Sequence, residues 1–167
     1  FLKRAKQRFG DQFDYSGIQW RSYKSPVKIR CCKHPVQEIT ITPERHLQTT
    51  GGCKHCLRER RVEALAPDSA AVAELPGRGL IVTAPGTEVD FVSRFFAPSC
   101  GIAEDPVTGS AHCSLTPYWA ERLGRSDLVA RQLSARGGML HCQLVEDRVL
   151  ISGRVIPYLS GVIHIDC

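Results

Sequence analysis

The sequence predicts an α+β protein of two units, a small basic module followed by a domain built from one helix and a mostly antiparallel sheet. The charge changes sign along the chain: residues 1–62 hold 14 Lys and Arg against 5 Asp and Glu, and the remainder holds 8 against 12. Four of the eight cysteines crowd between Cys31 and Cys56. After residue 79, strand-like apolar runs surround one long helical pattern. We therefore expect a module over residues 1–60, a linker with a short helix over 61–78 and a domain over 79–167.

The sequence also indicates the cellular compartment in which the protein is found. The sequence has no apolar run long enough to cross a bilayer and no secretory pattern at its N-terminus, so we expect a cytoplasmic protein without a membrane partner. The chain begins at Phe1 rather than at Met, so we expect a trimmed or partial product. In a reducing compartment, crowded cysteines indicate metal ligands, and scattered ones are buried or incidental thiols.

The basic module contains one predicted helix and two predicted strands. Residues 1–9 place their apolar side chains on one helical stripe, and Gly10 is a natural end. Residues 27–31 and 37–42 alternate in polarity, as half-exposed strands do. This pattern leaves few large apolar side chains for a core, so we expect a cross-link to stabilise the module.

The spacing of cysteine and histidine predicts a metal site. Two residues between ligands allow one tight turn to direct both donor atoms at the same ion, and two such turns complete a tetrahedron. The predicted ligands are Cys31, His34, Cys53 and Cys56. Such a closed set favours structural zinc. Cys32 could replace Cys31, His46 or His55 could replace His34, and a set of free thiols without metal is the alternative.

The same residues carry a resemblance to a known module. The order of AKQRFGDQFDYS, VKIRC-x2-H, His46-Leu47 and GGC-x2-C resembles a zinc-ribbon-like module found beside bacterial and phage endonuclease-type domains. The resemblance covers about residues 1–58 and departs from the family pattern at Pro35 and Lys54. It implies zinc binding and, less directly, contact with nucleic acid.

Aromatic residues interleave with the basic charge of this module. Phe13, Tyr15, Trp20 and Tyr23 lie among the lysines and arginines, a pattern that suits a phosphate backbone with stacked bases. The alternative is a solvated basic face over a small aromatic core. Charge alone does not decide between the two interpretations.

The second unit contains strand patterns around one helix. Residues 108–123 predict a helix that ends at Gly124 and contains Pro117. The predicted strands are residues 80–85, 89–98, 128–135, 137–147, 148–156 and 159–165. A helix wrapped by antiparallel strands is the simplest arrangement, because an apolar helix must be covered on every side.

The stretch SCGIAEDPVTGSAH, residues 99–112, predicts an anion site at the start of this helix. Free backbone amides and the helix dipole attract a carboxylate to the turn at Thr108, Gly109 and Ser110. Asp105 then lies where a substrate amine or hydroxyl would sit, which suits a zwitterionic ligand. The alternative is that Asp105 or Thr108 only caps the helix.

This half of the chain closely resembles a known enzyme family. The segment DFVSRFFAPSCGIAEDPVTGSAHCSLTPYWAERLG, followed by ARQLSARGG and DRVLISGRVI, resembles the C-terminal half of the phenazine-biosynthesis-like (PhzF-like) isomerases, from about Pro67 to Ile165. The resemblance implies the diaminopimelate-epimerase-like fold, with no organic cofactor. It implies that Asp105 binds substrate, as the one candidate catalytic residue, and that the Gly109 and Ser110 amides hold a substrate carboxylate.

The resemblance also implies a missing part. The general acid/base glutamate of the family lies in its N-terminal half, whose place the basic module takes here. Glu104 is a poor replacement because neighbouring side chains on an extended segment point opposite ways, and His112 is expected to be a satisfied helix histidine. We therefore expect weak or no isomerase activity on a small carboxylate-bearing substrate, and self-association through uncovered apolar surface. The alternatives are a zinc-stabilised nucleic-acid-binding protein, or a fusion or partial reading frame without a selected function.

Overall fold

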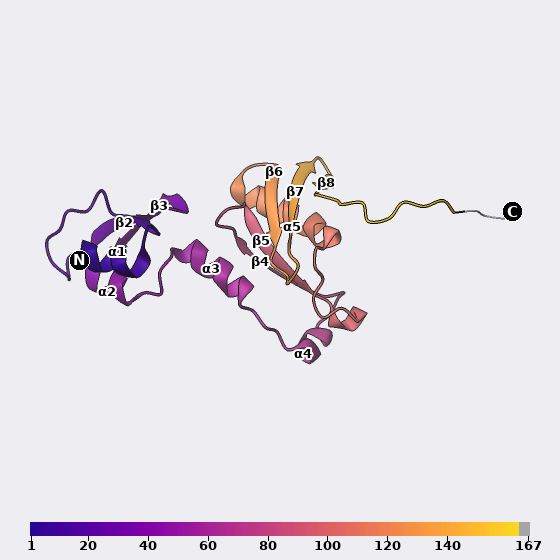
Figure 1. The fold of residues 1–167 in the computed structure, drawn as a ribbon, viewed down its shortest axis with the longest axis horizontal. Helices are drawn as coiled ribbons and strands as arrows, with labels where there is room; N and C mark the ends of the chain where they lie inside the picture. The colour runs from indigo at the N-terminus through magenta and orange to yellow at the C-terminus, as the bar shows by residue number, and fades with distance from the viewer. Residues whose placement is uncertain (164–167) are drawn as a thin grey trace.

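The computed structural model describes residues 1–163, which form two units joined by a helix (Figure 1). One unit has a three-stranded sheet and the other a five-stranded sheet. Both units mix helices and strands, which confirms the α+β class. The elements in chain order are α1 (Leu2–Phe9), β1 (Phe13–Asp14), β2 (Val27–Cys31), β3 (His34–Ile41), α2 (Pro43–Gln48), α3 (Lys54–Glu63), α4 (Ser69–Ala73), β4 (Leu80–Pro85), β5 (Phe91–Phe96), the short 3-10 helix η1 (Pro98–Cys100), α5 (Gly109–Leu123), β6 (Asp127–Gln132), β7 (Gly138–Val145) and β8 (Arg148–Ser152).

The N-terminal module is an antiparallel sheet in the order β1-β2-β3 with α1 and α2 against it. The predicted helical stripe of α1 buries Ala5 and Phe9, and Gly10 ends the helix with a φ of 54°. Strand β2 alternates between buried and exposed residues as its sequence pattern predicts. The core of the module is small and consists of Ala5, Phe9, Phe13, Tyr15, Val27 and Ile29.

Helix α3 connects the two units. It begins directly after Cys53 and runs to Glu63, so it crosses residue 60, where the sequence predicts the end of the module. Its last turn buries Val62 in a cluster with Ala84 of β4 and Val92 of β5. The same helix therefore belongs to the packing of both units, and the boundary at residue 60 stays a prediction.

The C-terminal domain is a sheet in the order β4-β5-β6-β7-β8. Every pair is antiparallel except β5 and β6, which are parallel because α5 carries the chain from one to the other. The indole of Trp119 on α5 stacks on Phe91 of β5 with ring centroids 5.6 Å apart. Gly124 ends α5 in the left-handed conformation. These features match the predicted helix against a mostly antiparallel sheet. No helix among residues 1–163 is long and apolar enough to span a membrane.

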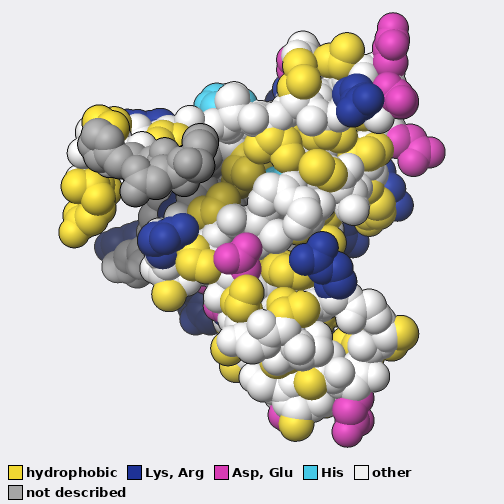
Figure 2. Space-filling view, turned by 90° about the vertical axis from the view of Figure 1, so that its right-hand side faces the viewer, with side chains coloured by type: hydrophobic (Ala, Val, Ile, Leu, Met, Phe, Trp, Pro, Cys, Tyr) yellow, Lys and Arg dark blue, Asp and Glu magenta, His cyan; other side chains and the backbone are white. Residues whose placement is uncertain are grey.

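The C-terminal segment, residues 153–163, differs from the prediction. Strand β8 ends at Ser152, and the described part of the strand predicted over 159–165 is neither helix nor strand; residues 164 and 165 lie outside the described range. The segment projects away from the domain (Figure 1). A β pattern needs a neighbouring strand to bond its backbone, and among residues 1–163 no strand pairs with this segment. Six of its large hydrophobic residues are more than 80% exposed: Val155, Ile156, Tyr158, Leu159, Val162 and Ile163. Hydrophobic side chains also gather on the face of the molecule seen in Figure 2.

Candidate functional site

The turn before α5 is held by one buried side chain, Gln132 at the end of β6. Its amide nitrogen donates to the carbonyl oxygen of Asp105 at 2.7 Å and to Oγ1 of Thr108 at 3.1 Å. Its amide oxygen accepts from the backbone N–H of Thr108 at 2.8 Å. The Thr108 hydroxyl in turn donates to Oδ2 of Asp105 at 2.5 Å. The carboxylate of Asp105 is therefore held beside the start of the helix.

Gly109 and Ser110 form the exposed first turn of α5. The first amides of a helix have no partner within it, so these two groups can donate to a ligand. A Cβ atom built on Gly109 meets no atom within 4 Å, so the space beside this residue is open. The structure thus brings together the three predicted substrate-binding residues, Asp105, Gly109 and Ser110, on one solvent-facing turn.

Glu104 points into a different network. Its two carboxylate oxygens accept from the Arg94 guanidinium at 2.7 and 2.9 Å. Arg94 also donates to the backbone carbonyls of Val62 and Glu63 at the end of α3. Because its carboxylate is occupied by this ion pair, Glu104 ties the segment before the Asp105 turn to α3. This agrees with the expectation that it is a poor acid/base group.

His112 lies inside the domain and does not face the turn's solvent side. The ring is fully buried, its Nδ1 lies 2.8 Å from the Thr108 carbonyl oxygen, and its Nε2 lies 3.4 Å from Oγ of Ser93. A carbonyl can only accept, so Nδ1 carries the proton and Nε2 accepts from the serine. Burial lowers the pKa of this imidazole, which keeps it neutral. As expected, it is a satisfied helix histidine that positions the first turn of α5.

Sequence reasoning did not single out Gln132 or Arg94. Both lie in strands as polar residues with mostly buried side chains. A buried polar residue in a strand must find hydrogen-bond partners, so its presence within an apolar run is the signal that could have pointed to them. The sequence could not show which backbone groups they reach, because those groups lie 24 to 32 residues away.

A second site lies at the edge of the N-terminal module, where Cys31, His34, Cys53 and Cys56 converge. Their ligand atoms all lie within 4.8 Å of one another. Nδ1 of His34 lies 3.7, 3.2 and 3.5 Å from the sulfurs of Cys31, Cys53 and Cys56. Cys56 Sγ lies 3.7 Å from Cys31 Sγ and 3.8 Å from Cys53 Sγ. These four residues, the Cys3His cluster, could hold a metal ion.

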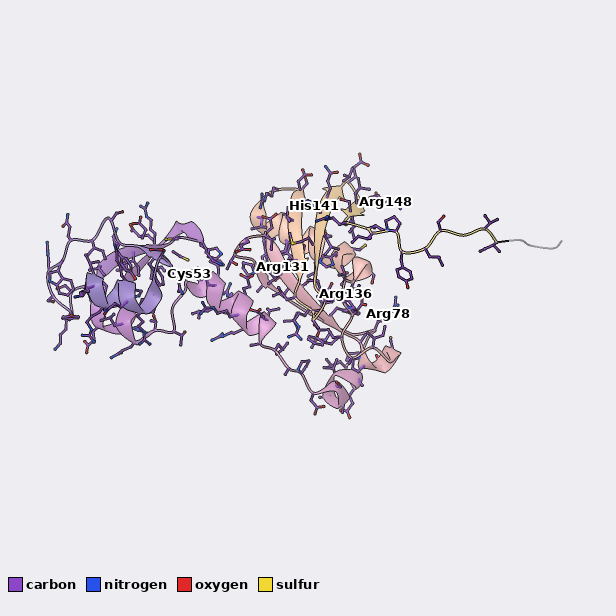
Figure 3. The ribbon with its side chains drawn as sticks, in the orientation of Figure 1. Cys53, Arg78, Arg131, Arg136, His141 and Arg148 are labelled. Carbon is purple, nitrogen blue, oxygen red and sulfur yellow. The ribbon has the colours of Figure 1, made fainter. Side chains whose placement is uncertain are left out.

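The structure selects among the ligands that the sequence left open. Cys32 is exposed and outside the group. His46 is buried in the aromatic core, where its Nε2 lies 3.0 Å from the Tyr15 hydroxyl. The His55 ring lies tilted beside that of His34, with ring centroids 5.2 Å apart, but His55 supplies no atom to the group. Figure 3 shows Cys53 beside the start of α3, on the side of the module nearest the C-terminal domain.

The electrostatics of the cluster favour a bound cation. Burial raises the pKa of the Cys31 thiol, but hydrogen bonds from His34 and the nearby backbone outweigh this effect and bring the pKa to about 7. Burial, together with the neighbouring Cys31 and Cys53 sulfurs, raises the pKa of Cys56 to about 12. The three sulfurs repel one another as thiolates, and a cation at their centre would remove that repulsion.

The aromatic residues of the module divide into two groups. Phe13 and Tyr15 are buried in its core, which fits the small aromatic core of the alternative interpretation. Trp20 and Tyr23 are 46% and 40% exposed and contact each other edge to face. Trp20 also stacks on Phe1 with ring centroids 5.6 Å apart, so a partner could reach the exposed parts of Trp20 and Tyr23.

The fold and the Asp105 turn define an α+β domain in which the first turn of α5 faces solvent. The chain belongs to the family described as phenazine biosynthesis-like protein, whose model matches residues 54–161. Residues 1–57 match a second family, described only as a protein of unknown function (DUF723). That description names no activity, so the zinc-ribbon-like character and the endonuclease association stay predictions.

The C-terminal part has close relatives. It is 59% identical over 107 residues to the Uncharacterized isomerase PA3578 of Pseudomonas aeruginosa, covering 64% of this chain and 41% of that protein. It is 50% identical over 93 residues to a phenazine biosynthesis-like domain-containing protein of Bos taurus, covering 52% of this chain and 32% of that protein. A PhzF family protein of Enterococcus faecalis aligns in structure with a TM-score of 0.56 and 52% identity, covering 57% of this chain and 37% of that one. The chain thus spans about two fifths or less of these relatives.

Proposed function

We propose that this chain is a PhzF-like isomerase or epimerase polypeptide whose C-terminal domain binds a small carboxylate-bearing metabolite at the turn from Asp105 to Ser110. One observation carries the proposal. Buried Gln132 fixes Asp105 and Thr108 from behind, while Gly109 and Ser110 remain open to solvent in front. A rigid turn that directs unpaired amides outward is suited to holding an anion.

The turn offers two kinds of contact. The amides of Gly109 and Ser110 donate to the substrate carboxylate, and the dipole of α5 adds to that attraction. The Asp105 carboxylate accepts from an amine or hydroxyl of the same molecule. These contacts orient the substrate, and isomerisation then requires a separate group that removes a proton from one carbon and returns it to another.

We propose that a second polypeptide chain supplies this proton-transferring group. Glu104 is engaged by Arg94, and His112 is buried and hydrogen-bonded at both nitrogens, so neither is free to exchange a proton with substrate. We expect the purified chain to show weak activity or none. Deuterium incorporation from D2O at a substrate carbon, catalysed at enzymatic rates by the chain alone, would contradict this part of the proposal.

Gly109 offers a matched test of carboxylate binding. Gly109→Pro removes one amide N–H at the first helical position, where proline is tolerated and where Thr108 already has the extended conformation that precedes proline. Gly109→Ala keeps the N–H and enters open space. The measurement is the shift of the Ser110 amide resonance on titration with glycine, alanine and lactate.

We expect carboxylate-dependent shifts in the unaltered chain and in Gly109→Ala, and shifts at least severalfold smaller in Gly109→Pro. Equal titration of both variants would show that the turn does not hold the carboxylate through this amide.

We also propose that the Cys3His cluster holds structural zinc. Zinc bonds of about 2.3 Å to sulfur and 2.0 Å to nitrogen place tetrahedral sulfurs about 3.8 Å apart, and sulfur and nitrogen about 3.5 Å apart. The distances of 3.7 and 3.8 Å from the Cys56 sulfur to the other two sulfurs, and of 3.2 to 3.7 Å from the sulfurs to Nδ1 of His34, fit that geometry.

Metal analysis tests this assignment on protein purified without added zinc. We expect about one zinc per chain. Cys53→Ser should lose it, and Cys113→Ser, which changes an exposed cysteine of α5, should keep it. No zinc in the unaltered chain would contradict the assignment.

Nucleic-acid binding by the N-terminal module is a second candidate, favoured by the exposed pair Trp20 and Tyr23 on a strongly basic unit. The test is binding to a single-stranded DNA or RNA oligonucleotide between 50 and 200 mM salt, a range over which phosphate contacts weaken binding by orders of magnitude. Trp20→Ala with Tyr23→Ala should weaken it, and Tyr118→Ala in the C-terminal domain should not. Binding that is absent or ignores salt would exclude this function.

A further inference from the structure

The two units meet at the Cys3His cluster through the second nitrogen of His34. Nδ1 of His34 faces the three sulfurs, and Nε2 lies 3.0 Å from the carbonyl oxygen of Gly86 in the C-terminal domain. When Nδ1 is a metal ligand, a neutral imidazole carries its only proton on Nε2. The ring then donates that proton to Gly86, which is the outer contact that commonly orients a ligating histidine.

Gly86 is part of a tight turn between β4 and β5. Its N–H donates to the carbonyl oxygen of Asp90 at 3.2 Å. A Cβ at this position would lie 2.5 Å from the Val89 carbonyl oxygen, so the turn requires glycine here. The acceptor of the His34 proton is therefore a carbonyl in a rigid hairpin of the C-terminal domain. Lys33 and Glu88 add an ion pair at 3.5 Å, but both side chains are largely exposed and contribute little.

Helix α3 links the same cluster to the same domain along a second route. Its N-terminal end carries Cys53 and Cys56 of the cluster. At its C-terminal end Arg94 of β5 donates to the carbonyls of Val62 and Glu63. The cluster, α3 and the β4–β5 turn therefore form a closed loop of contacts between the two units.

We propose that the Cys3His cluster is a joint whose metal occupancy holds the C-terminal domain against the N-terminal module, with His34 as the positioning residue. The inference rests on the proposed metal binding and goes beyond it, because a metal that only folds the module needs no bond to Gly86. Loss of the metal frees the imidazole to turn and change its protonated nitrogen, which removes the donor that faces Gly86.

His34→Cys separates metal binding from the joint. Four thiolates still bind zinc tetrahedrally, but the sulfur carries no N–H that can reach Gly86. Zinc content is measured together with amide hydrogen exchange of residues 85–90. Relative to the zinc-loaded unaltered chain, we expect full zinc in the variant and exchange of residues 85–90 that is roughly threefold to tenfold faster, the effect of one lost hydrogen bond. Lys33→Ala, the neighbouring control, should match the unaltered chain.

A second measurement uses the unaltered chain in case the variant does not fold. In the zinc-loaded protein the Nε2 proton of His34 should give a slowly exchanging NMR signal coupled to the Gly86 carbonyl carbon, and chelation should abolish it. Zinc binding without that signal, or His34→Cys with zinc and unchanged exchange, overturns the joint and leaves the zinc assignment standing. An unaltered chain that binds no zinc overturns both.

Discussion

The amide of Gln132 satisfies polar groups that the turn before α5 would otherwise bury without partners. It bonds the carbonyl of Asp105 and the N–H of Thr108 from the neighbouring strand, and it is itself fully buried. A buried polar side chain is costly unless its hydrogen bonds are complete, and here donor and acceptor are both used. The solvent-facing turn is therefore positioned by a side chain that is itself fully buried.

At the residue scale, His112 predicts how stability depends on pH. Burial lowers its pKa in the folded state below the ordinary value of 6.5, so the unfolded chain takes up the proton first as the pH falls. The stability that the neutral, buried imidazole contributes to the folded state is fully present above about pH 6.5. It is lost as the pH falls toward the folded pKa. The chain should lose up to about 1 kcal/mol between pH 6.5 and 5.5 from this group.

The measurement is urea unfolding of the unaltered chain and of His112→Gln at pH 7.5, 6.5 and 5.5. Because other groups also titrate here, the difference between the two chains is the quantity to compare. The unaltered chain should lose more stability on acidification than the variant. His141→Gln, which changes an exposed histidine of β7, should behave like the unaltered chain; equal losses in all three would refute the assignment to His112.

At the element scale, the end of α3 depends on Arg94. The guanidinium bonds Glu104 and two carbonyls of the last turn, and its side chain is only 12% exposed. Removing one partner of a mostly buried ion pair leaves an uncompensated charge. Arg94→Met should therefore lower the free energy of unfolding by roughly 3 kcal/mol.

A double-mutant cycle checks this prediction by chemical denaturation. Arg94→Met combined with Glu104→Gln should be more stable than the sum of the single changes implies, because the second change removes the unpaired charge. The exposed pair Lys28 and Glu38 is the control, and its cycle should give a coupling below about 1 kcal/mol. Additive effects at Arg94 and Glu104 would mean that the pair does not act as a unit.

At the scale of the whole molecule, the C-terminal segment leaves a large apolar surface in water. Exposed apolar surface of this extent favours association, and an unpaired β-prone segment can pair with a sheet edge. We predict that the chain self-associates with increasing concentration. Ile156→Ser with Leu159→Ser should reduce association, whereas Leu75→Ser, at an exposed site on the linker after α4, should not. Sedimentation velocity over a range of concentrations measures this; a monomer at every concentration would be the contrary result.

Much of the fold could be predicted because its signals are local. The alternation in β2, the glycine after α1 and the apolar runs of β4 and β5 each reflect a periodicity within a few residues. The strand predicted over 159–165 was wrong in its described part for the same reason, since a strand pattern does not state that a partner strand is present. Helix α3 was missed because its polar sequence buries little of its surface, only Cys56 and Val62.

The sequence by itself determined the chemistry that is available to this protein: four candidate metal ligands, three cysteines and one histidine in pairs separated by two residues, and the Asp105 to Ser110 turn at a helix start. These depend on residue identity and short spacing, which the chain carries locally. Only the tertiary structure decided that His34 rather than His46 joins the cysteines, that Gln132 clamps the turn and that Arg94 ties α3 to the domain. Those outcomes depend on contacts between residues distant in the chain, which form only when the sheets and helices pack.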